Sequence, residues 1–184
     1  MAVYNTSSDS ANTAIRAFLT KVGEYYLGHS VNTGRGKGKA LWLSIRDNDF
    51  NNCCAYCGEE NEKLQIEHVF MFNRTEFGLH HPGNIVPCCK GCNKRERLED
   101  KTYCDWEQHL VKVCERRGEP EKAKVRKQKI LDNFKKHQYP KLNTNEQHAI
   151  RVIASSLYEN IKTESEKSLD LYKKLDEAFV REAL

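Results

Sequence analysis

A chain of 184 residues can bury one sizeable hydrophobic core, or a smaller core with helical extensions. Its 39% hydrophobic and 30% charged residues are typical of a soluble, helix-rich protein, and no apolar run reaches the roughly 20 residues that a membrane-spanning helix needs. The net charge of +4 permits an anionic partner without requiring one.

Residues 1–18 contain no basic region followed by an apolar run and a cleavage site, so the sequence predicts a cytoplasmic protein. Eight cysteines are many for this length. Because cytoplasmic thiols stay reduced, clustered cysteines indicate a metal site rather than disulfides.

The amino-terminal part predicts two helices joined by a basic loop. Apolar residues at helical spacing indicate a helix that is capped around residues 8–10 and ends at Gly28. Residues 29–39 form a glycine-rich loop with three basic residues, Arg35, Lys37 and Lys39. This loop is either a solvated connector or a phosphate contact. A short helix is expected over residues 40–49.

The cysteine-rich middle of the chain predicts a strand, a loop, a second strand and a helix. Residues 64–70 (LQIEHVF) alternate apolar and polar side chains, as a strand does. Residues 71–83 are rich in turn formers, and residues 84–87 make the returning strand. The helix is expected to begin with Asn93 in its first turn.

Three further helical segments follow. Residues 102–118 and the strongly basic residues 121–138 read as two helices, separated by a Gly-Glu-Pro break. Residues 143–179 predict one long helix or two, with Asn143 or Thr144 as the cap. The apolar residues of this last segment can pack within the chain, form a homodimer or bind a partner protein.

Two Cys-x-x-Cys pairs flank the predicted hairpin. Each pair, Cys54 with Cys57 and Cys89 with Cys92, can grip one ion from a tight turn. Together they provide the four sulfur ligands of structural zinc, which would replace the large core that so short a segment cannot build. Gly58 lets the first turn close.

Other cysteines leave the ligand set open locally. Cys53 and Cys88 each precede a predicted ligand and also fit a three-residue gap, although two-residue gaps make the better turns. Cys104 and Cys114 are expected to be buried, inert thiols.

The motif order in residues 50–100 resembles that of the HNH endonucleases of the ββα-metal superfamily. That family carries C-x-x-C, then Asp-His or Glu-His, then Asn, then C-x-x-C-Asn. This chain carries the same order in the two cysteine pairs and in four further residues, Glu67, His68, Asn84 and Asn93.

The resemblance implies a role for each of these four residues. His68 matches the general base, and Asn84 matches the asparagine that braces the loop orienting it. Glu67 and Asn93 match the ligands of a catalytic divalent ion, although the family usually has Asp in place of Glu67. Oxygen ligands favour Mg²⁺ or Mn²⁺, and neutral imidazole can accept a proton from water near pH 7. His80 and His81, in the predicted loop, are either extra ligands or substrate contacts, or they face solvent or pack locally, and the latter is favoured.

Basic residues beside these motifs predict contacts with a phosphate backbone. They are the three of the glycine-rich loop together with Lys94, Arg95, Lys124 and Lys127. An ordinary solvated helix face is the alternative for the lysine-rich segment.

The sequence therefore predicts a mainly α protein with a small, zinc-stapled ββα-metal core and helices on both sides. Its expected parts are residues 1–49, 50–100 and 101–184. The expected function is a metal-dependent endonuclease that cuts or nicks DNA, in restriction, phage, mobile-element or defence settings. The alternatives are a non-catalytic zinc-knuckle protein that binds nucleic acid, and a nuclease acting on structured RNA.

Overall fold

The computed structural model describes residues 6–60, 63–99 and 102–179. The chain divides into two compact units, one of Met1–Phe18 with Leu142–Leu184 and one of Leu19–Lys141. Among the described residues, no helix combines the length and the apolar character that crossing a membrane requires.

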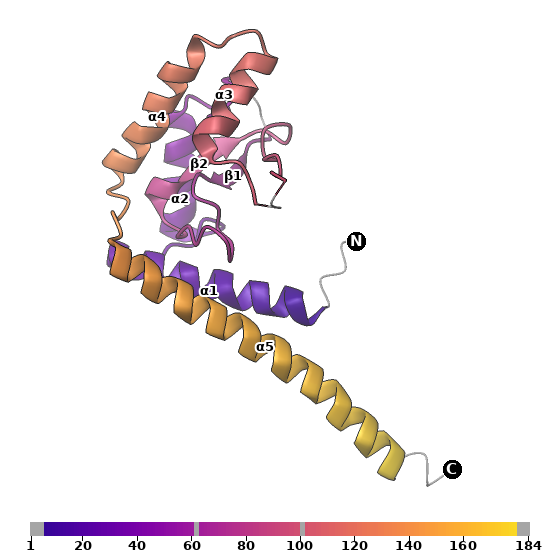
Figure 1. Cartoon of the computed structure of the whole chain (residues 1–184). Coiled ribbons are helices and arrows are strands. Elements are labelled where there is room, and N and C mark those ends of the chain that lie inside the picture. Colours follow the sequence, from indigo (N-terminus) through magenta and orange to yellow (C-terminus); the bar gives the residue numbers. More distant parts are fainter. Residues whose placement is uncertain (1–5, 61–62, 100–101, 180–184) are drawn as a thin grey trace. The chain divides into compact units, whose positions relative to one another are not determined.

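The first unit pairs two helices. The beginning of α1 (Ser7–Leu27) lies beside the first part of α5 (Thr144–Phe179), and both are drawn in Figure 1. The buried residues between them are Ala11 and Ile15 of α1 and Ile150, Ala154 and Tyr158 of α5. The Tyr158 hydroxyl also donates to Ser8 Oγ at 3.2 Å.

Capping residues decide where both helices of this unit begin. The Thr6 hydroxyl accepts from the Asp9 amide, so the cap lies just before the expected residues 8–10. Asn143 Oδ1 accepts from the Glu146 amide, and Glu146 Oε2 accepts from the Asn143 amide. This reciprocal pair selects Asn143 over Thr144 as the cap of a single long helix.

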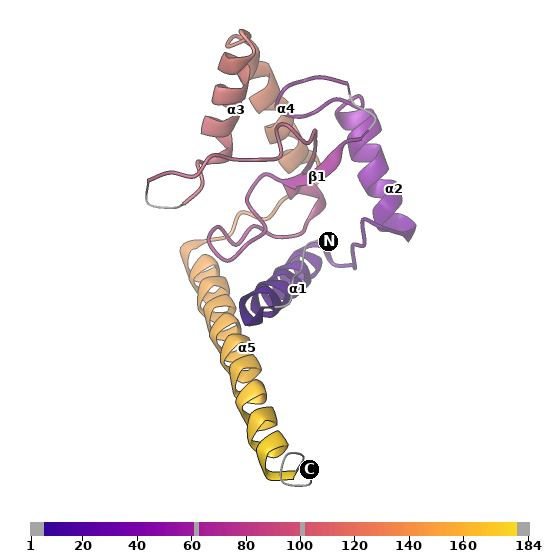
Figure 2. The same cartoon turned by 90° about the vertical axis from the view of Figure 1, so that its right-hand side faces the viewer.

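The second unit is built around one antiparallel hairpin. β1 (Gln65–His68) pairs with β2 (Ile85–Cys88), with Glu67 opposite Val86 and His68 opposite Ile85. Figure 2 shows β1 between α2 (Gly36–Ser44) and the pair formed by α3 (Trp106–Arg116) and α4 (Lys122–Lys136). The two predicted strands and the two helices after the cysteines are therefore present.

One hydrophobic core joins the hairpin to residues on both sides of it. Trp42 and Ile45 before the hairpin, and Trp106, Leu110 and Ile130 after it, share this core with the cysteine-bearing turns. The segment 50–100, expected as a module, thus shares its packing with its neighbours.

Two predicted boundaries were wrong. α2 begins at Gly36, inside the expected glycine-rich loop, and a π-helical turn (Ile45–Asp49) continues it. The residues after Asn93 form no helix over the described part of 93–105. The next helix, α3, lies within the separately expected residues 102–118 and starts at Trp106, where the Asp105 carboxylate accepts from the amides of Glu107 and Gln108.

Asn133 of α4 anchors the hairpin from behind. It is buried, and its Nδ2 donates to the carbonyls of Pro82, Gly83 and Ile85 at 3.2, 2.9 and 3.2 Å. Pro82 and Gly83 belong to the turn that leads into β2, and Ile85 is the first residue of that strand. The side-chain amide of Asn133 therefore supplies hydrogen bonds to backbone carbonyls that are buried away from water.

Replacing Asn133 with Ala should lower the free energy of unfolding by about 2–3 kcal/mol, because buried carbonyls lose their donor. Urea unfolding of zinc-loaded protein measures this. Asp132→Ala is the matched control, since Asp132 is exposed and bonds only along its own helix, to Gln128. Equal stability of the two variants would show that Asn133 does not anchor the hairpin.

Candidate metal centre and hairpin site

Four cysteines come together at the base of the hairpin. The Sγ atoms of Cys54, Cys57, Cys89 and Cys92 all lie within 4.8 Å of one another, and Cys57 Sγ is 3.8 Å from Cys89 Sγ. A tetrahedral ion with zinc–sulfur bonds of about 2.3 Å separates its sulfurs by about 3.8 Å. Three of the cysteines are buried and Cys89 is half-buried. The cluster fits a structural metal ion such as zinc.

The local backbone explains why these four sulfurs meet. Gly58 has a φ of 71° and its amide donates to the Cys54 carbonyl, which closes the first turn. The amides of Cys92 and Asn93 donate to the Cys89 carbonyl and close the second. The Ala55 amide donates to Pro87 O, so the first turn is fixed to β2.

The group of four contains none of the remaining described cysteines, as the two-residue spacing predicts, although the contact with the Cys54 thiol raises the pKa of the adjacent Cys88 thiol. Cys53 Sγ donates to the Asn51 carbonyl and Cys88 Sγ donates to the Cys89 carbonyl. Cys104 and Cys114 are fully buried, as expected of inert thiols. His109 of α3, which the sequence did not single out, bonds through Nε2 to the Cys92 carbonyl at 2.8 Å. α3 therefore supports the second turn from behind.

His68 is the last residue of β1 and is half-buried. Its ring stacks on Phe72, with 4.7 Å between the centroids and 19° between the planes. Its Nε2 lies 2.9 Å from Nδ1 of His80. Phe72 therefore fixes the plane of the His68 ring, and His80 fixes the rotation of the ring within that plane.

Asn84 connects the two ends of this loop. Its Oδ1 accepts from the Phe70 amide at 2.7 Å, and its Nδ2 donates to the carbonyls of Phe70 and Leu79, both at 2.9 Å. Asn84 is fully buried, and its own carbonyl accepts from the Val69 amide. Residues 70 and 79 precede Phe72 and His80 by two and one positions, so Asn84 fixes the segment that holds His68.

Glu67 points away from His68, because successive side chains of a strand face opposite sides. Its Oε1 accepts from Arg95 Nη2 at 3.2 Å. The same Nη2 lies 3.0 Å from the His68 carbonyl and 2.6 Å from the Val69 carbonyl. Burial raises the pKa of Glu67, and the Arg95 guanidinium opposes that shift.

Arg95 is only 6% exposed, which corrects its expected role as a phosphate contact. Nη1 lies 3.7 Å from Glu76 Oε2, so the guanidinium joins the end of β1 to the loop between the strands. The guanidinium is therefore used in contacts inside the protein and is not exposed to a phosphate backbone. Arg95 contacts Glu67 from a segment in which a helix was expected after Asn93 and none is present.

The expected hard-ion site does not fit this arrangement. Glu67 is paired with Arg95, and Asn93 Nδ2 donates to Gln65 Oε1 at 3.1 Å. Among the described cysteine, histidine and acidic residues, the four-cysteine cluster is the group placed to hold a metal ion. Glu67 thus serves as the carboxylate partner of Arg95. Glu67 and Asn93 do not form a preorganised set of ligands for Mg²⁺ or Mn²⁺.

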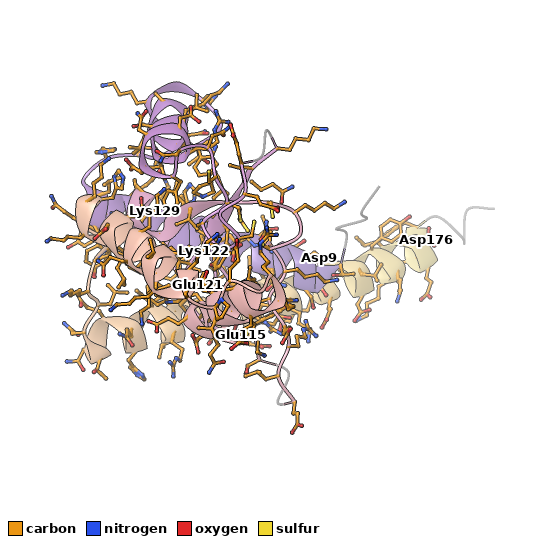
Figure 3. The ribbon with its side chains drawn as sticks, turned by 90° about the horizontal axis from the view of Figure 1, so that it is seen from above. Asp9, Glu115, Glu121, Lys122, Lys129 and Asp176 are labelled. Atoms are coloured by element: carbon orange, nitrogen blue, oxygen red, sulfur yellow. The ribbon has the colours of Figure 1, made fainter. Side chains whose placement is uncertain are left out.

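The predicted phosphate contacts differ in exposure. Arg35, Lys37, Lys39, Lys94 and Lys124 are exposed. Lys127 pairs with Glu107 of α3 at 2.5 Å and is half-buried. Figure 3 shows Lys122 and Lys129 along α4, with Glu121 immediately before that helix, and the helix itself is predominantly basic.

Phe72 is a residue of this site that the sequence did not identify, and His80, expected to face solvent or pack locally, contacts His68 there. Neither residue carries a spacing signal in a turn-rich loop. His81, beside them, is buried and its Nδ1 accepts from the Gly83 amide, so the expectation of local packing is confirmed for that residue. Comparison of the chain with protein-family models, curated protein sequences and solved structures finds no significant match.

Replacing Cys57 or Cys92 with Ser should remove bound zinc and lower the free energy of unfolding by more than about 4 kcal/mol, because metal binding here is folding free energy. Elemental analysis and chemical unfolding measure the two effects. Cys53→Ser is the control and should keep one zinc per chain. Loss of zinc in the control, or its retention in Cys57→Ser, would contradict the ligand set.

Proposed function

We propose that this protein is an HNH-type endonuclease that hydrolyses phosphodiester bonds in DNA, with His68 as the general base. The observation that carries the proposal is the placement of His68 at the end of β1, against Phe72 and His80, beside a loop fixed by Asn84. The four-cysteine cluster at the base of the same hairpin supports the family resemblance.

Phosphodiester hydrolysis requires His68 to act as a proton acceptor. A neutral imidazole takes a proton from water as the oxygen of that water attacks phosphorus, and the P–O3′ bond breaks while the leaving O3′ takes a proton from solvent. A base of this kind must be oriented, since a misplaced proton acceptor loses most of its effect. The stack on Phe72 and the bond to His80 supply that orientation.

The exposed basic residues support an anionic polymer as the substrate. Lys94 directly follows the second cysteine turn, and Lys124 lies on α4. Such side chains neutralise phosphates without reading the base sequence. A duplex is the proposed target, and cutting both strands with one such centre per chain needs either a dimer or two visits.

A zinc-knuckle protein that binds nucleic acid without cutting it is the second candidate. The pairing of Glu67 with Arg95 favours it, because this carboxylate is already neutralised from within the protein. Binding alone requires none of His68, Phe72 and His80 in their observed arrangement. The two candidates therefore differ in what replacement of His68 does.

His68→Ala should lower cleavage by about 100-fold or more, while zinc content and nucleic-acid binding stay unchanged, because the variant loses only the proton acceptor. The substrates are supercoiled plasmid, linear duplex, single-stranded DNA and total RNA, with Mg²⁺ or Mn²⁺ present. His148→Ala, which changes an exposed histidine of α5, is the matched control. Equal cleavage by wild type and folded, zinc-loaded His68→Ala would overturn the assignment, and cleavage of RNA alone would move the substrate from DNA to RNA.

Lys94→Gln combined with Lys124→Gln should weaken binding about equally for all duplex sequences, because both side chains would contact phosphates. The slope of log K against log salt should fall by about 1 for each contact removed. Lys167→Gln with Lys173→Gln removes the same charge from α5, where both lysines pair along the helix, and should leave binding unchanged. If the two double variants weaken binding equally, Lys94 and Lys124 act only through the net charge of the protein and make no specific phosphate contacts.

A further inference from the structure

The contact between His68 and His80 links the protons of the two rings. A neutral imidazole has one N–H donor and one lone pair, so a hydrogen bond between two neutral rings needs a donor on one and an acceptor on the other. His68 contributes Nε2 and His80 contributes Nδ1 to this bond, at 2.9 Å. The bond therefore allows two arrangements: either His68 Nε2–H donates to His80 Nδ1, or His80 Nδ1–H donates to His68 Nε2.

His80 is held in place more firmly than a loop residue usually is. The Leu79 carbonyl, one residue earlier, accepts from Asn84, and the Leu79 amide donates to the Tyr139 hydroxyl at 3.2 Å. A Cβ atom on Gly23 of α1 would lie only 2.3 Å from the His80 carbonyl oxygen, so the helix backbone meets His80 directly. The position of the His80 ring is thus set by contacts outside the hairpin.

Burial keeps His80 suited to this task. It lowers the pKa of His80 from its ordinary value, against a smaller upward effect of Glu24. His80 is thus neutral near pH 7 and able to accept a hydrogen bond. Phe72 lies 5.7 Å from His80 between ring centroids, so the three rings form one cluster.

We propose that His80 is a positioning residue for His68: its Nδ1 accepts a hydrogen bond from His68 Nε2–H, which leaves the lone pair of His68 on Nδ1 as the proton acceptor. This inference rests on the proposed function of His68 as general base. Phe72 fixes the plane of the ring, and His80 fixes its tautomer and its rotation within that plane. His80 itself touches no reacting atom in this role.

The test compares two replacements of His80. His80→Phe keeps the volume and the aromatic ring but removes the acceptor, so kcat should fall by about 10- to 100-fold with little change in KM. His80→Asn carries an amide oxygen where Nδ1 of the imidazole lies, and it should restore most of the lost kcat. A purely structural role predicts the reverse order, because Phe preserves packing better than Asn.

A spectroscopic measurement separates this inference from the proposed function. In ¹⁵N spectra of the folded wild type, His68 should show a protonated Nε2 and an unprotonated Nδ1, and His80→Phe should mix the two tautomers. A wild type that cleaves nothing but shows this tautomer would overturn the nuclease and keep the His80 contact. Wild-type kcat in His80→Phe, or a His68 proton on Nδ1, would overturn the role of His80.

Discussion

Four thiolates within 4.8 Å of one another repel unless a cation lies between them, and the rest of the second unit depends on that cation. A hairpin of four residue pairs is too small to be stable alone. An ion held by the four cysteines would join the base of the hairpin to the turn of residues 54–57. The Ala55 amide ties that turn to β2, and His109 of α3 bonds to the Cys92 carbonyl. Such an ion would do for this segment what a larger hydrophobic core would otherwise do.

From this base the order extends to His68 through buried polar contacts rather than through apolar packing. Asn133 supports the turn before β2, Asn84 clamps the loop between the strands, and Arg95 ties the end of β1 to that loop. Such networks specify geometry well because each unmet partner is costly in a medium that water does not enter. A general base needs a precise orientation, and a network of buried hydrogen bonds can hold it in that orientation.

The parts that the sequence predicted are those with a local signal. The cysteine spacing identified all four metal-binding candidates, the alternation in residues 64–70 identified β1, and helical periodicity identified α1, α3, α4 and α5. What it missed depends on contacts between distant residues. Arg95 is basic and adjacent to a lysine, so only its pairing with Glu67, 28 positions away, reveals that it is buried. His80 is a site residue only through its contact with the His68 ring, 12 positions away, and no helix forms over the described part of 93–105.

The central claim is that a single ion held by four cysteines organises the hairpin on which His68 lies. X-ray absorption at the zinc edge, on freshly purified protein that has met no chelator, tests it most directly. The account predicts one zinc per chain with four sulfur neighbours at about 2.3 Å. A first coordination shell that contains nitrogen or oxygen, or protein that is folded and free of metal, would contradict it.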